Sequence, residues 1–275
     1  MLKLLDRIYR RFFPKRMKDY PEYQTIFSGL KGMEVGGPSV AFSSKSFLPI
    51  YNVIAGLDGC NFSGNTVWEG DIKEGQTFRY ENKIGRQYIA DATDLSQIKD
   101  KTYDFVLSCH SLEHIANPIK ALNEWIRIIR DDGYVLMIMP HKDRTFDNKR
   151  PVTTLDHMVS DFEQGTTEDD STHFEDAIKL HDLSEDPGVK DYETLVERIK
   201  NNIDNRCLHH HVFNTPVLLK LLDFVNLKIL KVSHFSPYHI IVLSQKVKDR
   251  KADNSSILNP ANPIYINSPF PSDRL

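Results

Sequence analysis

The sequence contains few cysteines and no long apolar segment. Its three cysteines, Cys60, Cys109 and Cys207, are too few and too far apart for a disulfide framework or a four-cysteine zinc site. This usage is typical of a reducing compartment, so we predict a cytoplasmic protein. No secretory signal is visible at the N-terminus, and no apolar run approaches the roughly 20 residues that a transmembrane helix needs.

The sequence also lacks a basic excess. Its 35 lysines and arginines are outnumbered by 38 acidic residues, which gives a net charge of −3. Because a surface that binds nucleic-acid phosphates normally carries surplus positive charge, we expect no nucleic-acid partner. With 275 residues, 40% of them hydrophobic, the chain can bury the core of one domain that carries an insertion.

The most informative segment is a glycine-containing turn in residues 31–38, Lys-Gly-Met-Glu-Val-Gly-Gly-Pro. A short apolar strand there runs through Glu34 into Gly36 and Gly37, followed by Pro38. Glycines in such a turn let a ligand approach bare backbone. An acid just before them suits a positive ammonium group or ribose hydroxyls better than a pyrophosphate, which a carboxylate would repel.

Further strands follow this turn in alternation with helices. Residues 88–92 read as a strand that ends in an acid, and residues 103–108 read as a strand that continues into His-Ser-Leu-Glu-His at 110–114. A helix is expected next, and residues 132–140 read as a turn and a strand. This alternation predicts a parallel sheet with helices on both faces.

The order of these segments resembles the class I S-adenosylmethionine-dependent methyltransferases over residues 30–145, and the resemblance resumes at 209–245. It implies a Rossmann-like α/β fold with a seven-stranded sheet, helices on both faces and a helical insertion after the fifth strand. Residues 227–232 and 239–244 match the hairpin that closes the sheet in that family. The resemblance also implies a methyltransferase (EC 2.1.1) that converts S-adenosyl-L-methionine to S-adenosyl-L-homocysteine.

The resemblance assigns most of the cofactor site. The turn at 34–38 corresponds to the loop that binds the methionine part, although Pro38 stands where a third glycine is common and stiffens the loop. Asp91 with Ala92 corresponds to the pair that reads the adenine. The strand that follows contributes the remaining expected cofactor residues, Ser108 and His110.

Three acidic residues are candidates for the position that binds the ribose. Asp58 lies 24 residues after Glu34, at the end of the apolar run 52–57, which is near the spacing expected in the family. Glu69 and Asp71 are the alternatives.

We divide the chain into three parts. Residues 1–29 are an N-terminal amphipathic helix with a linker, residues 30–249 are the methyltransferase domain, and residues 250–275 are an irregular tail. Within the domain, 59–86 is expected to be a loop, and 141–208 a partly helical insertion. This insertion would lie over the carboxyl ends of the strands, where open α/β sheets bind ligands, and we predict that it is an acceptor-binding lid.

Residues 1–16 alternate apolar and basic side chains at helical spacing. A basic amphipathic helix of this kind can lie peripherally on an anionic membrane, here the inner face, or it can cap its own domain. We favour the cap.

Catalysis on a hydroxyl or amine acceptor requires a base near the methyl group, and histidine suits this role. Our first candidate is His141, after the fifth strand, with Asp143 placed to orient it. His110 is the second candidate. The triplet at 209–211, represented by His210, is the third.

His114 follows Glu113 in a Leu-Glu-His pattern that family members with unlike substrates share, so we expect it to cap or pack. No metal site is predicted. The alternative is a divalent ion held by His, Asp and Glu from 141–182, since some sugar methyltransferases of the family use one; against it, adjacent histidines on a strand point to opposite faces.

The segment 140–157 is rich in side chains that bind polyhydroxylated or phosphorylated ligands. With the late motif His-His-His-Val-Phe, it resembles bacterial-type methyltransferases linked to surface-glycan synthesis. That resemblance implies that the acceptor is a hydroxyl, or a phosphate-linked group, of a sugar or glycan intermediate in surface-polysaccharide biosynthesis. The nearest alternative is a methyltransferase of another small molecule or a protein. A non-catalytic cofactor-binding protein and a dinucleotide oxidoreductase are less favoured; the missing third glycine and the acid before the turn weaken the latter.

Overall fold

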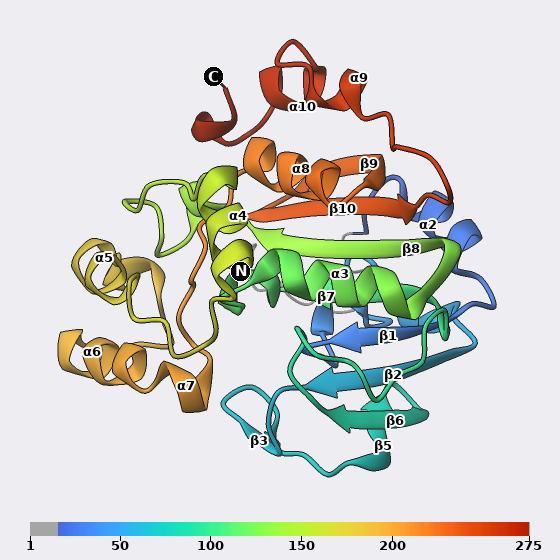
Figure 1. Cartoon of the computed structure of the whole chain (residues 1–275), viewed down its shortest axis with the longest axis horizontal. Helices are drawn as coiled ribbons and strands as arrows, with labels where there is room; N and C mark the ends of the chain where they lie inside the picture. Colours follow the sequence, from blue (N-terminus) through green and yellow to red (C-terminus); the bar gives the residue numbers. More distant parts are fainter. Residues whose placement is uncertain (1–15, 275) are drawn as a thin grey trace, which may run out of the picture.

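The computed structural model describes residues 16–274, and its centre is an eight-stranded mixed sheet (Figure 1). Five neighbouring strands run parallel, whereas β10 is antiparallel to both of its neighbours and β5 is antiparallel to β6. In spatial order the strands are β5 (Gly75–Tyr80), β6 (Lys83–Ile89), β2 (Gly56–Asn61), β1 (Lys31–Val35), β7 (Tyr103–Cys109), β8 (Ile129–Pro140), β10 (His239–Lys246) and β9 (Leu227–Phe235).

The predicted Rossmann-like methyltransferase fold is confirmed. The seven strands that follow β5 in this spatial order form the predicted seven-stranded sheet. The predicted hairpin of β9 and β10 closes it. The eighth strand, β5, lies in the segment 59–86 that was predicted to be a loop. That segment also contains the small hairpin of β3 (Asn65–Thr66) and β4 (Gly70–Asp71), so the loop prediction is wrong there.

One face of the sheet is covered by α3 (Pro118–Ile128), α4 (Leu155–Gln164) and α8 (Thr215–Phe224). Helix α3 begins where Asn117 caps it by accepting a hydrogen bond from the Lys120 amide, and Pro118 occupies its first turn. Its apolar face buries Trp125 completely against the sheet.

The other face is covered by shorter elements: α2 (Tyr20–Phe27) and the 3₁₀ turns η1 (Val40–Phe42) and η2 (Ile50–Asn52). Phe27 of α2 meets Phe105 of β7 edge to face, with ring centroids 5.0 Å apart. Both faces are therefore buried, as a parallel sheet requires.

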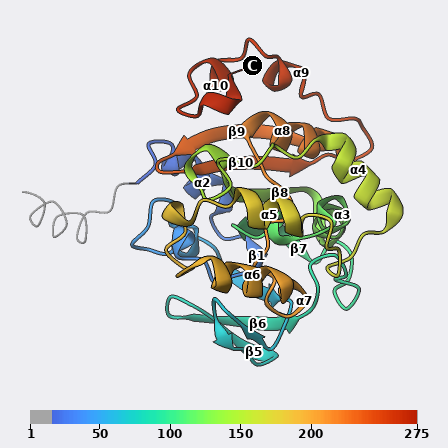
Figure 2. The same cartoon turned by 90° about the vertical axis from the view of Figure 1, so that its left-hand side faces the viewer.

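The insertion 141–208 leaves β8 and lies beyond the carboxyl ends of β1 and β2, where α5, α6 and α7 are seen in Figures 1 and 2. A short turn, η3 (Leu112–His114), follows β7 at the same edge. Besides α4, the elements of the insertion are η4 (Lys142–Arg144), α5 (Phe174–Leu180), η5 (Leu183–Glu185), α6 (Tyr192–Lys200) and α7 (Asn202–Asn205).

The C-terminal tail is not simply irregular. It forms α9 (Ser255–Leu258), α10 (Pro263–Ile266) and η6 (Pro271–Asp273), which lie beside α8 and β9 (Figure 1). The buried carboxylate of Asp273 accepts hydrogen bonds from the amide and hydroxyl of Thr215 and from the Ser268 hydroxyl. Because the two bonds from Thr215 span 58 residues of sequence, local pattern did not reveal them.

The predicted amphipathic helix falls almost entirely in residues 1–15, outside the described part of the chain, so its packing stays a prediction. Among residues 16–274, no helix is both long and apolar enough to cross a membrane.

Candidate active site

A cavity of about 1140 Å³ opens at the carboxyl ends of β1, β2, β6 and β7. One wall comes from the sheet edge and the loops that follow these strands. The opposite wall comes from the insertion, which contributes Arg144, Phe146, Glu197, Arg198 and Arg206 among others. The cavity therefore lies where an open α/β sheet is expected to bind its ligands.

Gly36 lines this cavity in a conformation that favours glycine. Its φ is +76°, and a Cβ at this position would collide with the Oγ of Ser111. The Ser111 hydroxyl is itself fixed because it donates a hydrogen bond to the carbonyl of Val35, at 3.1 Å. The turn thus presents bare backbone to a ligand, and Pro38 lines the cavity beside it.

Glu34 is fully buried beneath the turn and does not line the cavity. Its carboxylate accepts hydrogen bonds from the Ser39 amide at 3.0 Å and from the Tyr51 hydroxyl at 2.6 Å. Burial raises the pKa of Glu34 to about 7, against the lowering effect of these bonds. A Cβ on Gly37 would collide with the same carboxylate, so Glu34 and Gly37 shape the loop rather than face the ligand.

Asp58 is not at the ribose position. Strand β2 begins at Gly56, four residues later than the apolar run 52–57 suggested, so Asp58 lies inside the strand and away from the cavity. Its carboxylate accepts hydrogen bonds from the Tyr103 hydroxyl at 2.8 Å and the Arg86 amide at 2.9 Å. The prediction for Asp58 is therefore corrected.

Of the two alternatives for the ribose acid, Glu69 lines the cavity and Asp71 does not. Burial raises the pKa of Glu69. The carboxyl end of β2 itself carries Asn61, whose side-chain amide donates to the Gly37 carbonyl at 3.0 Å. Glu69 is thus the carboxylate best placed for a ribose.

Asp91 and Ala92 follow β6 and line the cavity, as expected. One oxygen of Asp91 accepts a hydrogen bond from the Thr93 amide at 2.8 Å, and the other accepts one from Arg206 of the insertion at 3.1 Å. Burial raises the pKa of Asp91, but the bonds from Thr93 and the charge of Arg206 outweigh burial and lower it. Asp91 is therefore an anion that can accept hydrogen bonds from a ligand.

We expect Asp91→Ala to weaken S-adenosylmethionine binding by about 1–3 kcal/mol, because a charged hydrogen bond to the cofactor would be lost. Isothermal calorimetry measures the effect. Asp94→Ala is the control, since Asp94 is an exposed residue three positions later that does not line the cavity. Equal affinities for both variants would contradict the role of Asp91.

Ser108 and His110, the two cofactor-binding residues predicted at the end of β7, lie in different surroundings. Ser108 is fully buried inside the strand and does not line the cavity, so its predicted cofactor contact is corrected. His110 lines the cavity with φ at +52°, and its Nε2 lies 3.0 Å from Nδ1 of His239. Burial, followed by the neighbouring His239 and His209, lowers the pKa of His110 to about 3. It is thus neutral near pH 7 but a weak base.

His141 cannot reach the cavity. Its ring is fully buried and stacks on Phe270 of the tail, with centroids 3.9 Å apart. Its Nε2 lies 2.9 Å from Asp273, and its Nδ1 accepts a hydrogen bond from the Asp143 amide. The carboxylate of Asp143 accepts instead from the Ser272 amide at 2.8 Å. Both residues anchor the tail, and their predicted catalytic roles are wrong.

The member of the triplet that lines the cavity is His209, not His210. Its Nδ1 lies 2.5 Å from Oδ2 of the buried Asp147, whose other oxygen accepts from Arg150 at 2.9 Å. Burial raises the pKa of Asp147, but His209 and Arg150 outweigh burial and hold it well below its usual range. Asp147 is therefore an anion that orients the His209 ring.

His210 is fully buried beside Asn202, whose amide nitrogen lies 3.0 Å from its Nε2. It does not line the cavity, so its predicted catalytic role is corrected. The sequence did not say which member of the triplet faces the ligand.

His114 and Glu113 also line the cavity, and His114, which was expected to cap or pack, has its Nδ1 3.1 Å from the Leu208 carbonyl. The His114 ring meets His209 edge to face at 4.5 Å. Glu113 is buried, neither of its carboxylate oxygens has a hydrogen-bond partner among residues 16–274, and burial raises its pKa to about 7. Glu113, His114 and His209 thus form one cluster of titratable groups at the cavity wall.

A family model matches part of the chain. Residues 55–137, from β2 into β8, match the family model described as a methyltransferase domain. No curated protein sequence matches the chain.

Similar solved structures include three methyltransferases. A SAM-dependent methyltransferase from Methanosarcina mazei is 14% identical, with a TM-score of 0.47, over 84% of this chain and 99% of the other. One from Mesorhizobium loti is 10% identical, with a TM-score of 0.45, over 83% and 97%. The 1,6-didemethyltoxoflavin-N1-methyltransferase of Burkholderia thailandensis, bound to its substrate and S-adenosylhomocysteine, is 9% identical, with a TM-score of 0.44, over 84% and 79%.

Proposed function

We propose that this chain, an S-adenosylmethionine-dependent methyltransferase, transfers the methyl group to a hydroxyl of a sugar or glycan intermediate in surface-polysaccharide biosynthesis. The observation that carries the proposal is the Asp147–His209 pair in a large cavity lined with polar groups. The insertion 141–208 is the acceptor-binding lid in this proposal.

The size of the cavity supports a second ligand beside the cofactor. Pockets for one small molecule commonly measure about 300–1,000 Å³, and this one is about 1140 Å³. The sheet-edge wall fits S-adenosylmethionine, because Gly36 leaves room for it and Asp91 and Glu69 offer carboxylates for its hydroxyl and amino groups. The insertion wall is then left for the acceptor.

The side chains of the insertion wall suit a polyhydroxylated, anionic acceptor. Asn201 supplies a neutral hydrogen-bonding group, whereas Asn205 and Thr194 line the wall with side chains that already bond to Arg198 and Asp191. Arg144 also lines the cavity, and its guanidinium forms no ion pair within residues 16–274. An arginine of this kind favours a phosphate or carboxylate, as on a phosphate-linked sugar.

When bound, S-adenosylmethionine supplies an activated methyl group, so the protein needs to align the acceptor oxygen and remove its proton. Nδ1 of His209 is engaged by Asp147, which leaves Nε2 to take the proton of an acceptor hydroxyl in the cavity. Asp147 stabilises the imidazolium that forms, since it remains ionised. Glu113 lies beside His209 and can accept a hydrogen bond from a neighbouring hydroxyl.

The proposal is tested by incubating the purified full-length chain with methyl-labelled S-adenosylmethionine and a panel of acceptors. The panel contains nucleotide sugars, phosphorylated sugars and short glycans, with amino acids and small amines as the comparison set. We expect label in a sugar methyl ether, identified by mass spectrometry. Transfer only to nitrogen, sulfur or carbon acceptors would contradict the proposal and favour a methyltransferase of another small molecule or protein.

A further inference from the structure

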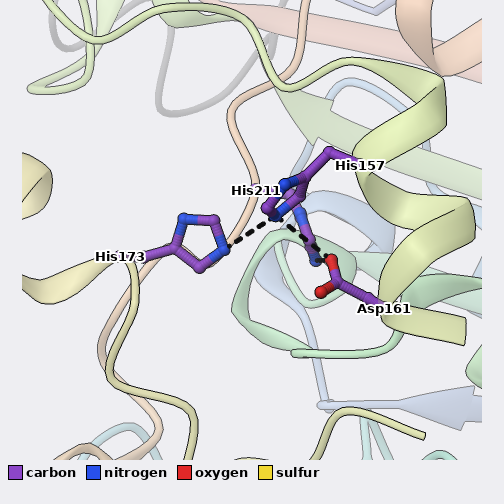
Figure 3. Close-up of side chains that lie close together, drawn as sticks. All are labelled: His157, Asp161, His173 and His211. Carbon is purple, nitrogen blue, oxygen red and sulfur yellow. Dashed lines mark hydrogen bonds and ion pairs between the residues drawn. The ribbon is translucent and has the colours of Figure 1, made fainter. Parts of the chain in front are cut away.

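Four potential metal ligands meet outside the cavity, at the junction of the insertion with the sheet domain (Figure 3). His157 and Asp161 come from α4, His173 stands at the N-terminus of α5, and His211 lies in the segment that returns to α8. None of the four lines the cavity. The proposed methyltransferase chemistry does not use them.

The ligand atoms are close enough for one ion to reach all of them. Nε2 of His157 lies 3.1 Å from Nε2 of His173 and 3.3 Å from Oδ2 of Asp161, and that carboxylate oxygen lies 3.9 Å from Nε2 of His211. One nitrogen or oxygen from each residue lies within 4.8 Å of the others. Zinc bonds of about 2.1 Å in a tetrahedron place neighbouring ligand atoms about 3.4 Å apart.

The local structure presets this arrangement. His157 and Asp161 are four residues apart on α4 and so share one helix face. That helix is fixed at its start by the Thr154 side chain, which accepts from the His157 amide at 3.2 Å. It ends at Gly165 with φ at +67°. The two ligands therefore stand on a capped, oriented helix.

Apart from its contacts with the histidines of the cluster, Oδ2 of Asp161 has no hydrogen-bonding partner among residues 16–274. Oδ1 of Asp161 accepts from the Thr166 hydroxyl at 3.2 Å. His211 is almost fully buried; its Nε2 lies 3.1 Å from the Ala116 carbonyl, and its Nδ1 has no partner in the same part of the chain. Nε2 is also the His211 nitrogen that lies 3.9 Å from Asp161, so binding an ion through it would replace its contact with the Ala116 carbonyl. Buried polar atoms left unpaired are costly, and a bound cation would remove that cost.

We propose that His157, Asp161, His173 and His211 bind a zinc ion in a closed, structural site. Three imidazoles and one carboxylate make a nitrogen-rich set of four, which suits zinc and not magnesium or calcium. The His157 side chain is 41% exposed, which leaves a path for the ion to enter. The ion joins α4, the segment before α5 and the return segment that leads to α8, and so fastens the base of the insertion to the sheet domain.

The test is the zinc content of purified full-length protein by plasma mass spectrometry, after equilibration with zinc and removal of free metal. We expect close to one zinc per chain in the wild type and at least a tenfold lower content in His173→Ala. His181→Ala is the matched control, because His181 flanks the other end of α5, is buried and pairs with Asp186 outside the cluster. The control should retain its zinc.

Asp161→Asn provides a second variant that preserves shape, and circular dichroism verifies that each variant folds. We expect this variant to fold and its zinc content to fall at least tenfold. Cobalt bound by the wild-type protein should show the visible spectrum of a tetrahedral site. The proposal is overturned if folded wild-type protein takes up no zinc, if His173→Ala and Asp161→Asn keep it, or if His181→Ala loses it equally.

Discussion

His209→Ala is expected to lower kcat for a hydroxyl acceptor on the order of 100-fold or more, the usual cost of losing a general base. Affinity for S-adenosylmethionine should change little, because His209 faces the cavity from the end of the insertion and not from the sheet-edge residues assigned to the cofactor. Steady-state kinetics and calorimetry on the same preparation separate the two effects.

The pH–rate profile distinguishes a base from a residue that only shapes the cavity. With His209 as the general base, the wild type and His209→Ala should differ in the shape of their pH–rate profiles. Asp147→Asn should also lower kcat, since the ring would lose the carboxylate that orients it and stabilises its charged form.

Two other variants make the assignment falsifiable. His141→Ala is expected to lower the melting temperature, because it removes the ring that Asp273 and Phe270 contact, while folded enzyme keeps its pH profile. His110 is the rival base, since it also lines the cavity. If His110→Ala abolishes turnover while His209→Ala keeps the wild-type kcat, the assignment to His209 is wrong.

The parts of the site that local pattern encodes could be predicted from the sequence. The glycine turn and the acid after β6 follow directly from strands that lead into Gly36 and Asp91, and the structure places both residues at the cavity. The fold could be predicted from the alternation of strands and helices along the sequence. The ribose position failed because the apolar run 52–57 was read as a strand that ends before Asp58, whereas β2 runs from Gly56 to Asn61 and places Asp58 inside the strand.

The base was mispredicted for a different reason. His141 does follow β8 at the correct edge, but the tail returns from more than 120 residues away and covers it with Phe270 and Asp273. No local signal reports such a contact. The partner of His209 is similarly distant, since Asp147 lies 62 residues earlier in the chain. Residues brought together by long-range packing thus decided which histidine faces the ligand.

Gly36→Val is expected to abolish S-adenosylmethionine binding, with an affinity loss on the order of 100-fold or more. A branched side chain at this position would collide with Ser111 and would fill the place where the ligand meets the backbone. It would also be strained, because φ is +76°. Strain alone could weaken binding by destabilising the fold, so a control with equal strain is needed.

Gly29→Val is that control. Gly29 has nearly the same φ, +74°, but a Cβ there would have no atom within 4 Å, and the residue does not line the cavity. Gly29→Val therefore carries the same backbone strain without the collision with Ser111, and thermal unfolding measures how far each variant is destabilised. Only Gly36→Val should lose binding when calorimetry is done on folded protein. Wild-type affinity in folded Gly36→Val would show that the cofactor does not approach this turn, and equal loss in both variants would attribute the effect to strain.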